Sequence, residues 1–183
     1  MVVSRTQPIL SHERTLGMSV MEGKGFYYPN DIAFAPDGKI FVLNRSLEGR
    51  GGGRGMRVAI CDSRDEYYGS FGDFGDGKGQ FKWPSAICVA PDGRVFVSDE
   101  HFHKIIIFSK DGDFINEWGQ LGSQKGLLDT PSGLTVNDWG ELFISDTYNH
   151  RIQVFTLDGK FKRSFGHGPL PEENLKLPWR LSI

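Results

Sequence analysis

Cysteine and excess charge are both scarce in this sequence. The 183 residues include only two cysteines, Cys61 and Cys88, and each lies in an apolar stretch. No disulfide framework is therefore expected, and buried free thiols are the simpler interpretation. Basic and acidic residues nearly cancel, at 21 and 23, for a formal net charge of −2. A balance this even gives no chain-wide attraction for nucleic acid or for an anionic membrane surface.

Long apolar runs are also missing. No stretch approaches the roughly 20 apolar residues of a membrane-spanning helix. The N-terminal "MVVSRTQPILSHERTLG" has no apolar core followed by a small-residue cleavage site, so it does not resemble a signal peptide. The expectation is a soluble, cytoplasmic protein. The sequence does contain 14 Phe, 5 Tyr and 4 Trp, which is enough aromatic content for a packed core. It also contains 24 Gly.

One sequence unit is repeated three times along the chain. Its clearest copy is "PSGLTVNDWGELFISDTYNHRIQVFTLDGKFKRSFG", and "PSAICVAPDGRVFVSDEHFHKIIIFSKDGDFINEWG" and "PNDIAFAPDGKIFVLNR" open in the same way. The units begin at Pro29, Pro84 and Pro131, and a fourth begins at Pro178. The separations are 55, 47 and 47 residues. A fixed period of this length indicates a repeat architecture.

Each unit reads as four short antiparallel strands. In the third unit they are "LTVN", "ELFISD", "HRIQVFT" and "KFKRSFG", with alternating apolar residues rich in Val, Ile and Phe. Turns such as "PDGK", "PDGR" and "LDGK" supply the positive φ that tight hairpins need. Four strands per 47 residues is typical of a β-propeller blade. The predicted fold is all-β: a partial propeller of three four-stranded blades, plus flanking strands from incomplete blades.

The repeat also divides the chain. The predicted parts are an N-terminal segment with the outer strand of a neighbouring blade (1–25), blade 1 with a Gly/Arg-rich insertion at 46–56 (26–80), blade 2 (81–127), blade 3 (128–170) and the innermost strand of an incomplete fourth blade (171–183).

The third unit strongly resembles an NHL repeat. The matching features are the opening proline and glycine, a strand ending in Ser-Asp, then "NHRIQVF" and "DGKF". The second unit has "FHKIIIF" in place of "NHRIQVF", and the first has "LNR" where the third has "SDT". The resemblance covers residues 26–166 and 177–183. It implies a propeller that usually has six blades, so this chain looks like the N-terminal half of one.

An open arc of blades would expose an apolar face at each end. If one face carries about 600 Å², leaving it in water forgoes about 15 kcal/mol at 25 cal/mol per Å². Apolar patches of this size on soluble proteins generally meet a partner. We therefore expect a homo-oligomer, a dimer in the simplest case, or a complementary chain that completes the ring.

Loops at one end of the blades are the predicted binding surface, because a rigid scaffold presents them. The loops that join the second to the third strand of a blade, and one blade to the next, emerge there. The predicted function is non-catalytic binding of a protein or peptide. The predicted ligand-binding residues differ between units while the framework does not; they are Arg45, Glu100, His101, Phe102, Thr147, Tyr148 and Trp179.

Charged pairs and histidines at these loops have structural interpretations. Asp99 with Lys104, and Asp146 with Arg151, close equivalent turns in two units, which favours a role in pinning the turn. His101, His103 and His150 would form a zinc site only if three imidazoles aimed at one point. His150 aligns with His103 as a repeated position that packs at the turn. No metal site and no cofactor are predicted.

Two alternatives remain. The first is a metal-dependent lyase or lactonase completed by further blades. Peptide-amidating lyases share NHL-like blades, but where they place a zinc-binding histidine this chain has Asn30, Ser85, Ser132 and Trp179. Asn30 and Asp31 could mimic the calcium ligands of sugar-lactone hydrolases, although no supporting acidic cluster is visible.

The second alternative is binding of single-stranded RNA. Some NHL domains bind it on this face, and "RGGGRGMR" places Arg50, Arg54 and Arg57 in a glycine-rich loop that could contact an RNA backbone.

Overall fold

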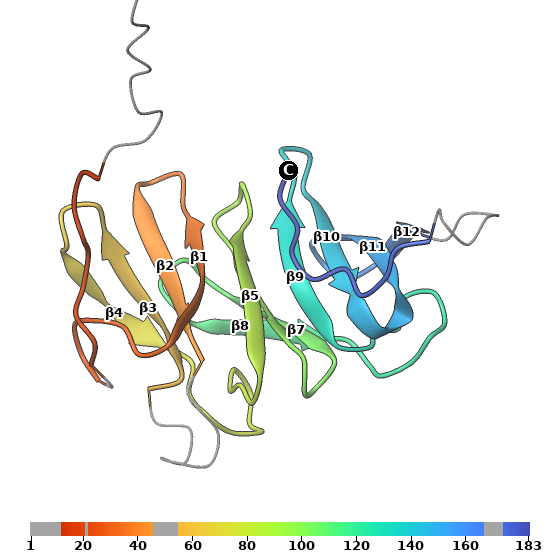
Figure 1. Ribbon diagram of the computed structural model, residues 1–183, viewed down its shortest axis with the longest axis horizontal. Helices are drawn as coiled ribbons and strands as arrows, with labels where there is room; N and C mark the ends of the chain where they lie inside the picture. The colour runs from red at the N-terminus through yellow and green to blue at the C-terminus, as the bar shows by residue number, and fades with distance from the viewer. Residues whose placement is uncertain (1–11, 21, 46–54, 167–173) are drawn as a thin grey trace, which may run out of the picture.

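Three similar sheets make up the protein. The computed structural model describes residues 12–20, 22–45, 55–166 and 174–183. In this part of the chain, twelve strands form three four-stranded antiparallel sheets in which neighbours follow chain order. We call the sheets blades 1 to 3 (Figure 1). This arrangement confirms the predicted all-β partial propeller.

The strand bounds are as follows. Blade 1 consists of β1 (Pro29–Phe34), β2 (Lys39–Asn44), β3 (Arg57–Asp62) and β4 (Tyr67–Phe71). Blade 2 consists of β5 (Pro84–Val89), β6 (Val95–Asp99), β7 (Lys104–Phe108) and β8 (Phe114–Trp118). Blade 3 consists of β9 (Pro131–Val136), β10 (Glu141–Asp146), β11 (Arg151–Thr156) and β12 (Phe161–Phe165). A 3-10 turn, η1 (Thr147–Asn149), links β10 to β11.

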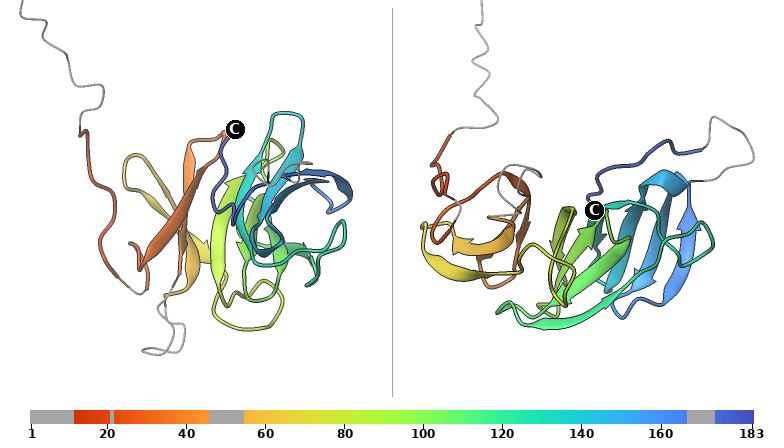
Figure 2. Two further views of the ribbon diagram at one scale, coloured as in Figure 1. Left: turned by 45° about the vertical axis from the view of Figure 1, so that its right-hand side comes forward. Right: turned by 90° about the horizontal axis from the view of Figure 1, so that it is seen from below.

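The hairpin turns form as the sequence predicts. Gly38 and Gly93 have φ of +87° and +86°, and their N–H groups donate to the carbonyls of Ala35 and Ala90. Glycine adopts this left-handed conformation at no steric cost, which is why a tight turn needs it here. The three inner strands β1, β5 and β9 stand side by side around the axis of the arc (Figure 2).

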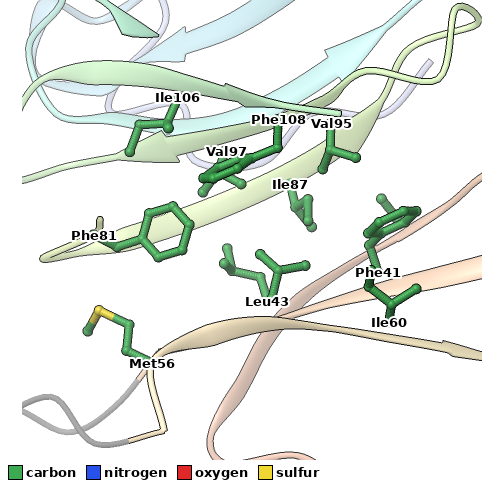
Figure 3. Packing of buried hydrophobic residues seen from close by; sticks show 12 residues of the cluster. Phe41, Leu43, Met56, Ile60, Phe81, Ile87, Val95, Val97, Ile106 and Phe108 are labelled. Atoms are coloured by element: carbon green, nitrogen blue, oxygen red, sulfur yellow. The ribbon is translucent and has the colours of Figure 1, made fainter. Parts of the chain in front are cut away.

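Blades are held together by apolar side chains that alternate along the strands. Phe41, Leu43 and Ile60 of blade 1 face Ile87 and Phe108 of blade 2 in one buried cluster (Figure 3). A second cluster joins blades 2 and 3. Its members include Phe96, Ile105, Leu134, Ile144 and Phe155. A single four-stranded sheet cannot bury both of its faces, so each blade depends on its neighbours for stability.

The outward side of blade 1 is not bare. Ile40, Val42 and Cys61 point away from blade 2, yet all three are buried, and Leu16 and Phe26 pack against them. The chain itself therefore covers part of the face that the sequence predicted would need a partner. Both Cys61 and Cys88 are free and buried, and burial raises the pKa of the Cys88 thiol far above its usual range.

The flanking segments differ from the expected strands. Residues 12–18 and 174–183 lie beside the blades but form no strand. The reason is that an isolated strand has no neighbour to complete a ladder of main-chain hydrogen bonds. Among the residues that the structure describes, no helix has the length and apolar character to cross a membrane.

Candidate functional site

The blades present two different ends. The β1–β2, β5–β6 and β9–β10 hairpins lie at the top in Figure 1. The loops that leave β2, β6 and β10 lie at the other end, which we call the loop face. Every predicted ligand-binding residue in the described part of the chain lies there or in the tail segment, residues 174–183.

The first residue after the second strand of each blade occupies an equivalent place. These residues are Arg45, Glu100 and Thr147. The N–H groups of Arg45 and Glu100 donate to the carbonyls of Tyr28 and Trp83, each of which precedes the proline that opens its unit. These main-chain bonds fix the predicted residues at the inner rim of the loop face.

Glu100 and Arg45 are brought together across two blades. Arg45 Nη2 lies 3.3 Å from Glu100 Oε2, and Ser85 Oγ donates to Glu100 Oε1 at 2.7 Å. The Glu100 residue is only 6% exposed. A buried carboxylate needs such partners, because its charge has lost the hydration of water. Glu100 therefore fixes blade 1 against blade 2 beneath the loop face.

Thr147 makes the corresponding contact between blade 3 and the tail segment. It is fully buried, and its hydroxyl donates to the carbonyl of Pro178 at 2.8 Å. Ser132 Oγ forms a hydrogen bond with Thr147 Oγ1 and contacts the carbonyl of Trp179. Glu100 and Thr147 thus lie within the protein, and the outermost groups at the loop face are aromatic.

The aromatic rim consists of Tyr28, Trp83, Tyr148 and Trp179. All four side chains are exposed large hydrophobic groups at the loop ends of the sheets or in the tail segment. The Trp83 and His101 rings pack edge to face at 5.2 Å, and His101 does the same with Phe102 at 4.9 Å. Sequence analysis missed Tyr28, although its place directly before Pro29 matches that of Trp83 before Pro84.

The two predicted turn pairs behave differently. Arg151 Nε lies 2.7 Å from Asp146 Oδ2, and both side chains are buried. Lys104 instead contacts Glu117 across β7 and β8 at 2.8 Å. The Asp99 carboxylate accepts backbone N–H groups, from Lys82 and Trp83 on one oxygen and from His101 and Phe102 on the other. Both aspartates hold their turns by accepting main-chain N–H groups, and Asp146 adds the ion pair with Arg151.

Two histidines link successive blades. His103 Nδ1 accepts the N–H of Thr130 at 3.1 Å, and His150 Nδ1 accepts the N–H of Leu177 at 3.2 Å. Thr130 and Leu177 each precede the proline of the next unit, so the bond repeats in register. Within the described ranges no three His, Cys, Asp or Glu side chains gather where they could hold a metal ion.

The structure describes the arginine-rich loop only from residue 55 onward. Arg50 and Arg54 lie outside the described residues. Arg57 begins β3 and is 6% exposed, and its guanidinium donates to the carbonyls of Gly23 and Gly25. In the structure Arg57 therefore anchors the segment before β1 and presents no exposed charge to a ligand.

Asn30 and Asp31 are also occupied by contacts within the protein. Asn30 Nδ2 donates to the Ser85 carbonyl. Asp31 accepts the N–H of Ile87 at 2.9 Å and a hydrogen bond from Arg180 at 2.7 Å. Arg180 follows blade 3 in the chain, so this ion pair joins the tail segment to blade 1 across the axis.

Comparison with known proteins agrees with this geometry. The family model described as NHL repeat matches residues 128–155, which span β9 to β11 of blade 3. The match falls on the unit whose Asp146–Arg151 pair and His150 bond hold the loop face. Blade 3 of this partial β-propeller therefore carries an NHL repeat.

A curated relative matches a short stretch of the chain. The B-box type zinc finger protein ncl-1 of Caenorhabditis elegans is 42% identical over 48 residues, which is 26% of this chain and 6% of that protein. The match therefore spans less than a tenth of the relative's length.

Solved structures share the propeller fold. The virginiamycin B lyase of Staphylococcus aureus, solved as an inactive variant with quinupristin, is 18% identical with a TM-score of 0.57, covering 83% of this chain and 44% of that one. A chain of a nidogen/laminin complex is 19% identical with a TM-score of 0.55, covering 83% and 51%. At this identity the likeness concerns the propeller fold alone.

Proposed function

We propose that this NHL-repeat chain is a non-catalytic binding protein whose ligand, a protein or peptide, docks on the aromatic rim. The observation that carries the proposal is the exposure of Tyr148 and Trp179, at 59% and 50%. Tyrosine and tryptophan are the residues most enriched among those that dominate binding energy at protein interfaces. Here they sit on a scaffold that the Glu100, His103 and His150 contacts hold rigid.

Rigidity under the rim favours binding. A side chain that is already positioned loses less conformational entropy when it meets a partner. Trp83 illustrates this, because its backbone accepts from Glu100 and its ring packs on His101. The nidogen/laminin neighbour shows that this type of fold occurs in a protein complex, which is consistent with a protein ligand.

Selection from a random-peptide display library, followed by titration of the enriched peptides, tests this proposal. Trp179→Ser and Tyr148→Ser should each weaken binding about tenfold or more, since hot-spot residues contribute above about 1–2 kcal/mol. Ile115→Ser is the matched control, because Ile115 is a half-exposed apolar residue of the outer strand β8. Binding that withstands both rim substitutions would overturn the proposal, and chemical conversion of the bound peptides would support the lyase-like alternative.

We also propose that a second copy covers the outward side of blade 3. Ile152 pairs with Phe165 across β11 and β12, so the two side chains share one face. Phe165 is 48% exposed and Leu175 is 36% exposed, whereas blade 1 has Leu16 and Phe26 over its outward side. The outward side of blade 3 thus presents two apolar side chains that a second copy would bury.

Sedimentation equilibrium checks the second copy. The chain has a mass of 20.5 kDa, and the wild type should show twice this mass at micromolar concentration. Phe165→Lys should return it to the monomer mass, because a charge cannot be buried there without a partner. A wild-type protein that stays monomeric would contradict this arrangement.

A further inference from the structure

A pocket of about 400 Å³ lies along the axis of the arc, away from the aromatic rim. Its walls come from β1, β5, β9 and the tail segment. The lining side chains at equivalent positions of the three inner strands are Ile32, Ile87 and Leu134, followed by Phe34, Val89 and Val136. A second pocket shares Phe34, Val89 and Val136 and continues to the hairpin end. The two pockets are contiguous through these shared residues and extend toward the hairpin end, and together we call them the channel.

The β1 side of the channel is unusually open. Ile87 and Leu134 are buried, but Ile32 and Phe34 of β1 are 52% and 68% exposed. Ile183, which lines the same pocket from the tail segment, is 74% exposed. Three large apolar side chains therefore face solvent in a single cavity, and burying them would be favourable.

The opposite wall offers main-chain hydrogen-bonding groups. The N–H groups of Arg180, Leu181, Ser182 and Ile183 make no hydrogen bond within the described part of the chain, and neither do the carbonyls of Arg180, Leu181 and Ser182. The Arg180 side chain holds this wall in place by its ion pair with Asp31. The channel thus combines apolar side chains on β1 with a free polypeptide edge on the tail segment.

We propose that this channel binds an extended peptide strand of a partner protein, with apolar residues at alternate positions. An extended strand meets both requirements, because its main chain pairs with a free edge while alternate side chains enter apolar pockets. A purely aliphatic ligand would strip water from the N–H groups of residues 181–183 without replacing those hydrogen bonds, which is costly. β1 has six residues, so a strand of similar length, about 20 Å, matches the channel.

The probe is a synthetic heptapeptide in which three valines alternate with two threonines between terminal lysines. Its binding is followed by fluorescence anisotropy of an attached dye. Phe34→Ser should weaken binding about tenfold or more, because the side chain becomes buried on binding. Phe34 is exposed in the free protein, so this variant should fold, and circular dichroism checks that it does. Ile115→Ser on the outer strand β8 is the matched control and should leave the affinity unchanged, whereas weakening by Tyr148→Ser would place the peptide on the aromatic rim.

A second peptide isolates the main-chain contribution. It has the same sequence but carries N-methyl groups on alternate amides, which blocks pairing along one edge while keeping the side chains. The unmodified peptide should bind and should slow hydrogen exchange of the Leu181, Ser182 and Ile183 amides, whereas the methylated peptide should bind far more weakly.

Three outcomes would overturn the proposal. They are equal binding of both peptides, which would indicate apolar insertion; equal weakening by Tyr148→Ser; and protection of residues 181–183 without peptide in Phe165→Lys, the variant expected to be monomeric, which would show that the chain itself already pairs this edge. If Phe34→Ser does not weaken binding of the heptapeptide, the titrations of library-selected peptides against Trp179→Ser and Tyr148→Ser still stand. The channel and the aromatic rim are therefore tested separately.

Discussion

At the scale of single residues, equivalent turns are held by different chemistry. Asp146 is fully buried and contacts Arg151, Gln153 and Asn149, while the equivalent Asp99 accepts only main-chain N–H groups. The third unit therefore depends on a buried ion pair that the second unit lacks. Removing one partner of such a pair strands the other charge in the interior.

Arg151→Ala should lower the free energy of unfolding by about 3–5 kcal/mol, the cost of breaking a buried pair from one side. Lys104→Ala, at the equivalent position of blade 2, should cost about 1 kcal/mol or less, because Glu117 is partly exposed and keeps access to water. Urea unfolding of both variants provides the comparison. Equal losses would show that the two turns are held in the same way.

Asp62 gives the fold a defined acid sensitivity. Desolvation raises its pKa, but hydrogen bonds from the Glu66 and Arg64 N–H groups, the Arg64 side chain and Tyr68 outweigh it and lower the pKa to about 2. The unfolded value is about 3.9. The folded pKa is the lower one, so this contribution to stability is present above about pH 4 and is lost as the pH falls toward 2.

Asp62→Asn should therefore lower the melting temperature at neutral pH. The difference from wild type should shrink steadily between about pH 4 and pH 2, where the wild-type carboxylate becomes protonated. Thermal unfolding followed by circular dichroism across this pH range measures it. A difference that stays constant down to pH 2 would mean that the charge of Asp62 contributes nothing.

At the scale of elements, glycines at the ends of the outer strands set how closely successive blades approach. Gly72 follows β4 with φ of +74°, and a Cβ there would lie 2.1 Å from the Phe81 ring. Phe81 is fully buried in the cluster between blades 1 and 2. Gly38 has a similar φ of +87° but open space around it.

Gly38→Ala should cost about 1–2 kcal/mol for the left-handed backbone alone. Gly72→Ala should cost about 1–3 kcal/mol more, because Phe81 must move within a packed core. Chemical denaturation of the two variants separates backbone strain from crowding. Similar losses would show that Phe81 can shift freely and that the blades are not closely packed there.

The strands could be predicted from the sequence because their signals are local. Alternating apolar residues and Asp-Gly turns are read within a few positions, and they gave the twelve strands correctly. The tail segment was expected to form a strand and does not, since a ladder also requires a neighbour that no local pattern supplies. The bond between Arg180 and Asp31 joins residues 149 positions apart, and no spacing in the sequence indicates it.

At the scale of the whole molecule, the repeated unit explains how the tail segment is held against blade 3 although it forms no strand. Bonds such as Ser132 to Trp179 and His150 to Leu177 hold the tail segment as the inner strand of a following blade would be held. The sequence predicted that Glu100 and Thr147 lie in the loops at one end of the blades, and they do, but it could not show that both are buried there. Burial depends on the neighbouring blade and on the tail segment, which lie far away in the chain.

The most direct test of the account is a hydrogen-exchange footprint of the protein bound to a library-selected peptide. The proposed binding surface predicts slower exchange in the loops around Trp83, Tyr148 and Trp179, with no change in the β1–β2 and β5–β6 hairpins. It also predicts that the footprint disappears in Trp179→Ser. Protection confined to the hairpin end, or release of a converted peptide, would contradict the central claim that the aromatic rim binds a ligand without catalysis.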